Sequence, residues 1–170
     1  MEDKSYKEYL KHITTFMFDV DGVLTDGSLT VATNGDLLRT MNVKDGYAMK
    51  QALTKGFNIC IISGGTNEGV KKRLNTLGIK DVYLGAHQKT DQFTEYVTKH
   101  NIKPESVLYM GDDIPDIPVM KIVGLATCPV DAVAEVKANS KYISHKHGGK
   151  GCVRDVIEQV MKVQDKWVKL

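Results

Sequence analysis

Short apolar runs alternate with amphipathic segments along nearly the whole 170-residue chain. The apolar runs have the length of buried strands and lie at residues 13–18, 57–62, 81–85, 106–110, 125–128 and 142–144. Helical spacing is found at residues 3–11, 45–56, 67–77, from 90 on, 117–123, from 131 on and 152–167. This alternation predicts an α/β fold, a Rossmann-like three-layer sandwich with a mostly parallel sheet and helices on both faces.

One interval departs from the alternation, between the first strand and the helix that follows it. Asp26-Gly27 and Asn34-Gly35 are turn signals, and apolar positions alternate in the segments 28–33 and 37–43. We therefore expect a β-hairpin with Asn34-Gly35 as its tight turn. In this interpretation residues 22–43 form a flap beside the end of the first strand.

The composition disfavours several classes of protein. With 42% hydrophobic and 26% charged residues, and no repeat or linker-like tract, residues 1–170 are expected to form a single domain. A net charge of only +2 gives no electrostatic reason to bind nucleic acid or a membrane surface. No apolar run approaches the roughly 18 residues of a membrane span, and the N-terminus lacks the apolar core of a signal peptide. We therefore expect a cytoplasmic protein, in which the widely spaced Cys60, Cys128 and Cys152 are buried free thiols.

Polar side chains follow four of the predicted strands at the point where each strand ends. They are Asp19 and Asp21 after the first strand, Ser63 after the second, Lys89 after the third, and Asp112, Asp113 and Asp116 after the fourth. Each residue alone is compatible with an ordinary turn, because Asp, Ser and Gly are common turn residues. The carboxyl ends of parallel strands meet at one edge of the sheet, however, and ligands bind there. We therefore expect these side chains to form one site.

The residue types at this edge suit phosphoryl transfer. Carboxylate oxygens from Asp19 and Asp112 are ligands for a hard cation such as Mg²⁺. Ser63, the backbone amides of Gly64 and Gly65, and the ammonium group of Lys89 can bind the oxygens of a phosphoryl group. One carboxylate can attack phosphorus to form an aspartyl-phosphate, and a second can transfer the protons.

Four ordered motifs carry a resemblance to a known family. Asp19-Val-Asp-Gly-Val-Leu-Thr-Asp26, Ser63, Lys89 and Gly111-Asp-Asp-Ile-Pro-Asp116 resemble the motifs of the haloacid dehalogenase (HAD) phosphatases, over essentially the whole chain. The resemblance implies a HAD-like fold in which Asp19 is the nucleophile and Asp21 the general acid and base.

The same resemblance implies how the remaining motif residues act. The Asp19 carboxylate, the Asp21 backbone carbonyl and Asp112 would hold Mg²⁺. Ser63, Gly64 and Lys89 would bind the phosphoryl group. Asp113 and Asp116 would orient metal-bound waters and Lys89.

The intervals after Asp21 and around Lys89 leave no room for an inserted cap domain, so the chain resembles the capless branch of this family. Members of that branch form homotetramers in which a neighbouring subunit helps to cover the active site, and the resemblance implies the same here. Gly148-Gly-Lys-Gly-Cys-Val-Arg-Asp155 is similar to the segment that reaches the neighbouring subunit in phosphatases of an eight-carbon keto sugar acid. Residues 145–170 are therefore expected to contact a neighbour, with the glycine-rich stretch as a mobile, cationic lead-in to a helix. The candidate contacts for a phosphorylated sugar acid are Thr25, Gly65, Arg73, Lys150 and Arg154.

Alternatives stay open. The relative that acts on the nine-carbon KDN 9-phosphate carries a glutamate where this chain has Gly65, which favours the eight-carbon acid of lipopolysaccharide synthesis. Sialate 9-phosphate is a further alternative substrate. A receiver-like signalling domain also uses aspartates, a hydroxyl residue and a lysine, but its phosphorylated aspartate follows a later strand. A non-catalytic scaffold is disfavoured because every motif residue is present.

Overall fold

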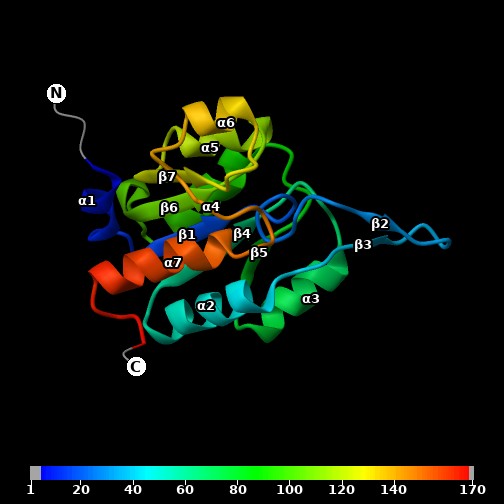
Figure 1. Ribbon diagram of the computed structural model, residues 1–170, viewed down its shortest axis with the longest axis horizontal. Coiled ribbons are helices and arrows are strands. Elements are labelled where there is room, and N and C mark those ends of the chain that lie inside the picture. The colour runs from blue at the N-terminus through cyan, green and yellow to red at the C-terminus, as the bar shows by residue number, and fades with distance from the viewer. Residues whose placement is uncertain (1–4, 169–170) are drawn as a thin grey trace.

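The structure, a computed structural model, describes residues 5–168 and has one six-stranded sheet with a two-stranded hairpin beside it (Figure 1). The strands of the sheet are β1 (Thr15–Phe18), β4 (Asn58–Ile62), β5 (Asp81–Tyr83), β6 (Val107–Met110), β7 (Leu125–Cys128) and β8 (Tyr142–Ile143). They all run parallel, in the order β5-β4-β1-β6-β7-β8, as predicted. The chain winds outward from β1 first to one side and then to the other. Open α/β sheets bind ligands at such a reversal, which lies here at the end of β1.

Helices cover both faces of this sheet, which confirms the three-layer prediction. They are α1 (Tyr6–Leu10), α2 (Val43–Thr54), α3 (Glu68–Thr76), α4 (Lys89–Lys99), α5 (Ile117–Met120), α6 (Ala134–Ala138) and α7 (Cys152–Val163), with 3₁₀ turns η1 (Pro104–Ser106) and η2 (Ile114–Asp116). The apolar sides of α2, α3 and α7 share one hydrophobic core, and those of α4, α5 and α6 share another on the opposite face (Figure 1).

Strand β1 is buried on both faces, which explains its continuous apolar sequence. Phe16 and Phe18 belong to the core under α2 and α7, whereas Met17 between them belongs to the core under α4 and α5. All three side chains are fully buried. Successive strand residues point to opposite faces, and a parallel strand in mid-sheet has an apolar layer on each side. The loop that follows β1 is therefore held by packing from both faces.

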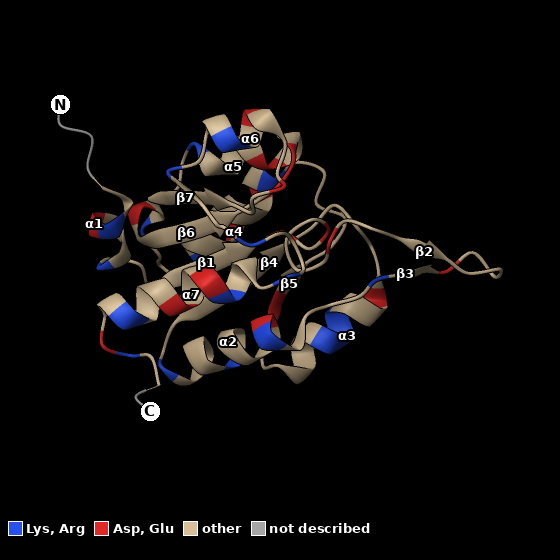
Figure 2. Ribbon diagram, in the orientation of Figure 1, with Lys and Arg blue, Asp and Glu red and all other residues tan. Residues whose placement is uncertain are grey.

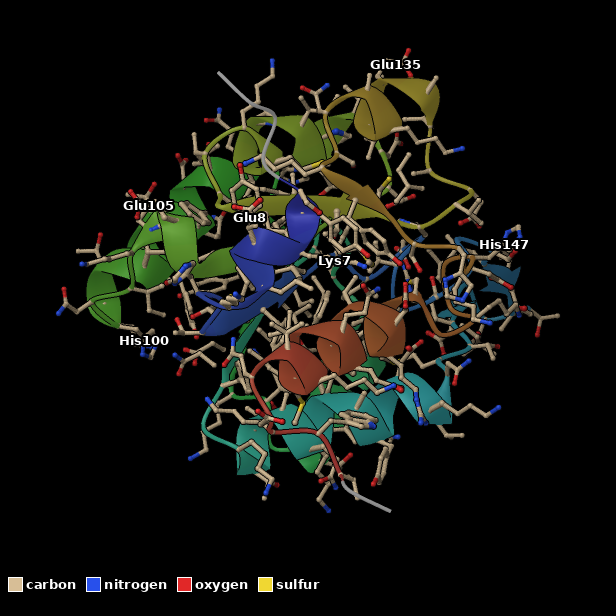
Figure 3. The ribbon with its side chains drawn as sticks, turned by 60° about the vertical axis from the view of Figure 1, so that its left-hand side comes forward. Lys7, Glu8, His100, Glu105, Glu135 and His147 are labelled. Atoms are coloured by element: carbon tan, nitrogen blue, oxygen red, sulfur yellow. The ribbon has the colours of Figure 1, made fainter. Side chains whose placement is uncertain are left out.

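No charged residue lies in β1, β4, β6 or β7, and apart from Asp81 in the edge strand β5 the charged residues of the described chain lie on helices and loops (Figure 2). Side chains such as Glu8, Glu105 and Glu135 point outward into solvent (Figure 3). Within residues 5–168, buried charged side chains are confined to Asp19, Asp45, Lys89 and Asp116.

The predicted hairpin is present as β2 (Thr30–Val31) and β3 (Leu37–Leu38), and it projects from the body of the protein (Figure 1). Its turn differs from the expected one. Gly35 alone has a positive φ, of 88°, and its N–H donates to the Ala32 carbonyl, so Thr33 and Asn34 form the turn and Gly35 the left-handed position after it. Apolar side chains of both strands are exposed.

The ends of several helices also differ from the expected ones. Asn42 caps α2, and its side chain accepts a hydrogen bond from the Lys44 N–H. Helix α4 begins at Lys89, after Gln88, one residue before the expected start at residue 90. Helix α7 ends at Val163, before the predicted end at residue 167. Cap identity depends on one or two side-chain contacts, which apolar periodicity does not report.

All three cysteines are free and buried, as expected. Within residues 5–168, no helix combines the length and apolar character that crossing a membrane requires. Residues 1–4 and 169–170, at the ends of the predicted single domain and including the start of the predicted helix 3–11, lie outside the described residues.

Candidate active site

The loop after β1 turns sharply back on itself and presents two carboxylates. The Val20 carbonyl accepts hydrogen bonds from the N–H groups of Val23, Leu24 and Thr25, at 2.9–3.2 Å. Gly22 has a φ of 83°, and a Cβ on it would overlap the Asp112 carboxylate. A glycine at this position therefore lets the β1 loop and the β6 loop approach each other closely.

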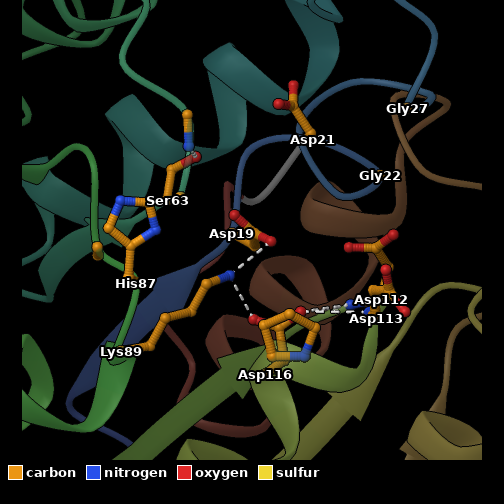
Figure 4. Close-up of a pocket in the computed structure, with 14 residues that line it drawn as sticks. Asp19, Asp21, Gly22, Gly27, Ser63, His87, Lys89, Asp112, Asp113 and Asp116 are labelled. Atoms are coloured by element: carbon orange, nitrogen blue, oxygen red, sulfur yellow. Dashed lines mark hydrogen bonds and ion pairs between the residues drawn. The ribbon is translucent and has the colours of Figure 1, made fainter.

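Lys89 lies between two buried carboxylates (Figure 4). Its Nζ is 2.7 Å from Asp19 Oδ2 and 2.6 Å from Asp116 Oδ1, and its side chain is only 4% exposed. Burial lowers the pKa of Lys89, but the two carboxylates outweigh burial and raise it, so the residue is a cation. Lys89 is the first residue of α4, so the loop that follows β5 places its ammonium group at the same edge of the sheet as Asp19.

Asp116 organises the floor of the site and is fully buried. Its Oδ1 accepts hydrogen bonds from Lys89 Nζ and from the Tyr109 hydroxyl, each at 2.6 Å. Its Oδ2 accepts from the backbone N–H groups of Asp112 and Asp113, at 3.0 and 3.3 Å. A buried carboxylate with four donors fixes both the lysine and the backbone that carries Asp112.

Carboxylate oxygens of Asp19, Asp112 and Asp116 lie within 4.8 Å of one another, a spacing that suits a cation. Burial, followed by repulsion from the Asp116 carboxylate, raises the pKa of Asp19 to about 6, although the charge of Lys89 opposes the shift. Burial and the charge of Asp19 raise the pKa of Asp112 to about 8. No donor among residues 5–168 reaches the buried Oδ1 of Asp112. An unpartnered carboxylate oxygen beside other carboxylates fits a hard divalent ion, which binds oxygen ligands and removes the repulsion.

Asp21 faces a different part of the site from Asp19. Its side chain is 35% exposed, and both of its oxygens accept hydrogen bonds from Arg39 of the flap. Asp19 Oδ1 instead accepts from the Val20 N–H at 2.6 Å. The two aspartates therefore have different surroundings, one buried beside a lysine and one partly open to solvent, as separate chemical roles require.

The loop after β4 forms the opposite wall of the pocket. Ser63 is buried, and its Oγ accepts a hydrogen bond from the Gly65 N–H at 3.2 Å. Ser63, Gly64, Gly65 and His87 line the pocket with Asp19, Asp21, Gly22, Gly27, Lys89, Asp112, Asp113, Pro115 and Asp116 (Figure 4). Its volume is about 390 Å³, enough for a small ligand. The structure thus brings together every motif residue expected at the strand ends.

The candidate substrate contacts lie in several places. Gly65 lines the pocket. Thr25 is fully buried, and its Oγ1 accepts hydrogen bonds from the N–H groups of Gly22 and Gly27, so within one chain it stabilises the loop. Arg73 is exposed on α3, close to Gly46 of α2. Lys150 and Arg154 line a second pocket beside α7, outside the catalytic pocket of their own chain.

The glycine-rich segment before α7 is packed against the catalytic loop, which differs from the mobile lead-in that we expected. Gly148 is buried, and its N–H donates to Asp131 Oδ1 at 2.9 Å, although His147 beside it points outward (Figure 3). The Gly149 N–H donates to the Val23 carbonyl at 2.9 Å. The segment therefore supports the back of the loop that carries Asp19 and Asp21.

Sequence reasoning missed Arg39, Tyr109 and His87. Arg39 follows two leucines in the flap and Tyr109 lies inside an apolar run, so local patterns describe them as a surface cation and a core aromatic residue. His87 follows β5 two residues before Lys89, and this position at a strand end was the available signal.

Comparison with known proteins agrees with this geometry. The chain is 39% identical to the 3-deoxy-D-manno-octulosonate 8-phosphate phosphatase KdsC of Salmonella typhi over 156 residues, which is 92% of this chain and 83% of that protein. The family model of haloacid dehalogenase-like hydrolases matches residues 80–157. The chain belongs to the haloacid dehalogenase-like hydrolase family.

Solved structures of family members have the same fold. The 3-deoxy-D-manno-octulosonate 8-phosphate phosphatase of Yersinia pestis is similar with a TM-score of 0.93 and 34% identity, covering 96% of this chain and 88% of that one. The Moraxella catarrhalis enzyme, in complex with magnesium, phosphate and KDO, has a TM-score of 0.91 and 31% identity, covering 94% and 92%. Within the family, this chain shares the architecture of structures that hold a divalent ion and a phosphate.

Proposed function

We propose that the chain is a Mg²⁺-dependent phosphatase that hydrolyses 3-deoxy-D-manno-octulosonate (KDO) 8-phosphate to KDO and phosphate. The observation that carries this proposal is the match to phosphatases of that substrate along nine-tenths of the chain. The arrangement of Asp19, Lys89 and Asp112 around one pocket supports it, because these groups suit transfer of a phosphoryl group.

The chemistry begins at Asp19, whose carboxylate attacks phosphorus. A bond forms between a carboxylate oxygen and phosphorus while the bond from phosphorus to the sugar oxygen breaks, and Asp21 gives a proton to the departing oxygen. Water then attacks the aspartyl-phosphate and passes its proton to Asp21. The bond between phosphorus and Asp19 breaks, which releases phosphate and restores both side chains.

The remaining residues hold the phosphoryl group and the cation. Lys89, Ser63 and the amide of Gly64 bind the phosphoryl oxygens. Asp19, Asp112 and the backbone carbonyl of Asp21 hold Mg²⁺, which neutralises charge on the transferring group when it is bound. Asp113 and Asp116 keep these groups in place, and Asp116 does so through its contact with Lys89.

Steady-state turnover of a panel of sugar-acid phosphates tests this function. We expect KDO 8-phosphate to have a higher kcat/KM than KDN or sialate 9-phosphate, and turnover to require Mg²⁺. Asp19→Asn and Asp21→Asn are expected to lose activity, whereas Asp36→Asn, on the exposed hairpin turn, serves as the matched control. Equal rates for the wild type and Asp19→Asn contradict the mechanism, and a higher kcat/KM for a nine-carbon substrate contradicts the assignment.

We also propose that the protein is a single capless domain that acts as a cytoplasmic homotetramer. Exposed apolar side chains on the flap, Val31 at 70% and Leu38 at 53%, support an assembly that covers them. In such an assembly the 145–170 segment brings Lys150 and Arg154 to the substrate bound by a neighbour, and Arg73 is a further candidate contact with the sugar acid. Sedimentation analysis is expected to give four subunits, and Arg154→Ala to raise KM. A monomer in solution contradicts this proposal.

A further inference from the structure

Arg39 reaches from the flap to Asp21, which lines the catalytic pocket. Its Nε is 2.7 Å from Asp21 Oδ1 and its Nη2 is 2.9 Å from Asp21 Oδ2, so the guanidinium group engages both oxygens. The Arg39 side chain is only 8% exposed although it comes from a projecting hairpin. Two parallel charge-assisted hydrogen bonds fix the orientation of a carboxylate as well as its position.

The flap backbone holds Arg39 from behind. The Leu37 carbonyl accepts hydrogen bonds from Arg39 Nη1 at 3.1 Å and from Asn67 Nδ2 at 3.0 Å. Asn67 in turn caps α3, because its Oδ1 accepts from the Val70 N–H. The base of the flap is therefore tied to the catalytic loop on one side and to α3 on the other.

Gly65 leaves the space that the guanidinium group occupies. A Cβ at this position would lie 3.3 Å from Arg39 Nη2, 3.4 Å from Asp21 Oδ2 and 3.5 Å from Ser63 Oγ. Arg39 and Asp21 thus lie directly against the loop that lines the opposite wall of the pocket.

We propose that Arg39 is a positioning residue that orients Asp21 for hydrolysis of the aspartyl-phosphate, an inference that rests on the proposed function. Both Asp21 oxygens accept hydrogen bonds from Arg39, which fixes the plane of the carboxylate that is to receive a proton from water. Each carboxylate oxygen has two lone pairs, so each keeps one that the guanidinium group does not use. In this step the water oxygen bonds to phosphorus, the water proton moves to Asp21, and the bond from phosphorus to Asp19 breaks.

Arg39→Met tests this role, because it keeps the apolar stem and removes the guanidinium group. We expect kcat for KDO 8-phosphate to fall by about tenfold, a part of the 10²–10⁴ that proton transfer contributes, with KM within about twofold of wild type. We expect Arg39→Lys to stay low, because one ammonium group cannot make both bonds. Added guanidinium ion is expected to restore part of the activity of Arg39→Met. Lys55→Met, at the exposed end of α2, is the matched control and should keep wild-type kinetics.

Rapid-quench kinetics separate the two half-reactions. If Arg39 serves the water-attack step, Arg39→Met releases KDO in a burst before phosphate, and intact-mass spectra show one phosphoryl group on the protein. A fall in kcat without a burst, a rise in KM alone, or unchanged kinetics overturns the proposal. Thermal unfolding of each variant shows whether it is folded, and guanidinium rescue cannot come from a misfolded protein. Loss of Mg²⁺-dependent turnover in the wild type would instead refute the proposed function, so the two failures are distinguishable.

Discussion

Replacing Gly148 by alanine is expected to damage catalysis although this residue does not line the catalytic pocket. A Cβ on Gly148 would lie 2.6 Å from the Gly22 carbonyl carbon and 2.9 Å from the Thr25 carbonyl oxygen, and closer still to the Gly22 carbonyl oxygen. Ordinary contact begins at 3.4 Å, so the catalytic loop must move by about 1 Å to accept the methyl group. The atoms in the way are backbone atoms, which cannot rotate aside.

Two magnitudes follow from this displacement. Overpacking of this kind costs about 1–3 kcal/mol of stability. For a chain of this length each kcal/mol lowers Tm by about 2–4 °C. Displacing a catalytic group by about 1 Å can cost about 100-fold in rate. Because Gly22 lies next to Asp21 and against Asp112, we expect kcat of Gly148→Ala to fall by 10- to 100-fold, about 1.4–2.7 kcal/mol in the barrier.

The assay compares Gly148→Ala with Gly56→Ala. Gly56 has a φ of 82°, and no heavy atom of the described chain lies within 4 Å of a Cβ built on it. Gly56→Ala therefore costs only backbone strain, about 1–2 kcal/mol, far from the pocket. We expect both variants to lose similar stability in urea unfolding and Gly148→Ala alone to lose kcat. A Gly148→Ala variant that is destabilised but keeps kcat within about twofold of wild type would refute this reasoning.

Three further changes test the surroundings of the site. Asp116→Asn is expected to lower kcat at least tenfold and to cost about 1–3 kcal/mol in urea unfolding, because it removes one of the two buried carboxylates that Lys89 contacts and a buried acceptor of the Tyr109 hydroxyl; unchanged kcat contradicts this. Burial raises the pKa of Asp45 from 3.8 to about 6, so the stability that protonation of Asp45 gives is complete below pH 3.8 and lost as pH rises through about 6. Asp45→Asn is therefore expected to gain stability relative to wild type between pH 4 and pH 7, by up to about 3 kcal/mol, and a pH-independent difference in urea unfolding contradicts the assignment. Gly65→Glu places a second carboxylate beside Arg39, so it is expected to draw Arg39 away from Asp21 and to lower kcat more than the uncharged Gly65→Gln does. Equal kinetics of the two variants in steady-state assays rule this out.

The sequence predicts much of the site because the site follows from topology. Asp19, Ser63, Lys89 and Asp112 each come directly after an apolar run, and parallel strands bring such positions to one edge. The residue types then restrict the chemistry. The position of the site and its chemistry can therefore both be inferred without knowing which side chains face each other across the core.

The contacts that support the site could not be predicted, because they depend on which residues face each other in the folded chain. Arg39 pairs with a residue 18 positions away, and Asp45 accepts a hydrogen bond from the Arg154 N–H, 109 positions away. Gly148 lies against a loop near the start of the chain. Periodicity tells which face of an element is buried but not which residue lies opposite, so these positions look like a flap cation, an acidic first turn of a helix and a flexible glycine.

The crowding of Asp19, Asp112 and Asp116 around Lys89 has a consequence for how this protein evolves and how it can be engineered. Three carboxylates around one ammonium group leave negative charge unbalanced. Burial, followed by repulsion from Asp19 and Asp116, raises the pKa of Asp112 to about 8. In metal-free buffer the site therefore opposes folding, and Asp112→Asn is expected to raise Tm while it abolishes turnover. Added Mg²⁺ is expected to raise the Tm of the wild type and not that of Asp112→Asn, and scanning calorimetry measures both. Selection for thermal stability alone would replace Asp112, so thermostability and activity are opposing traits at this position.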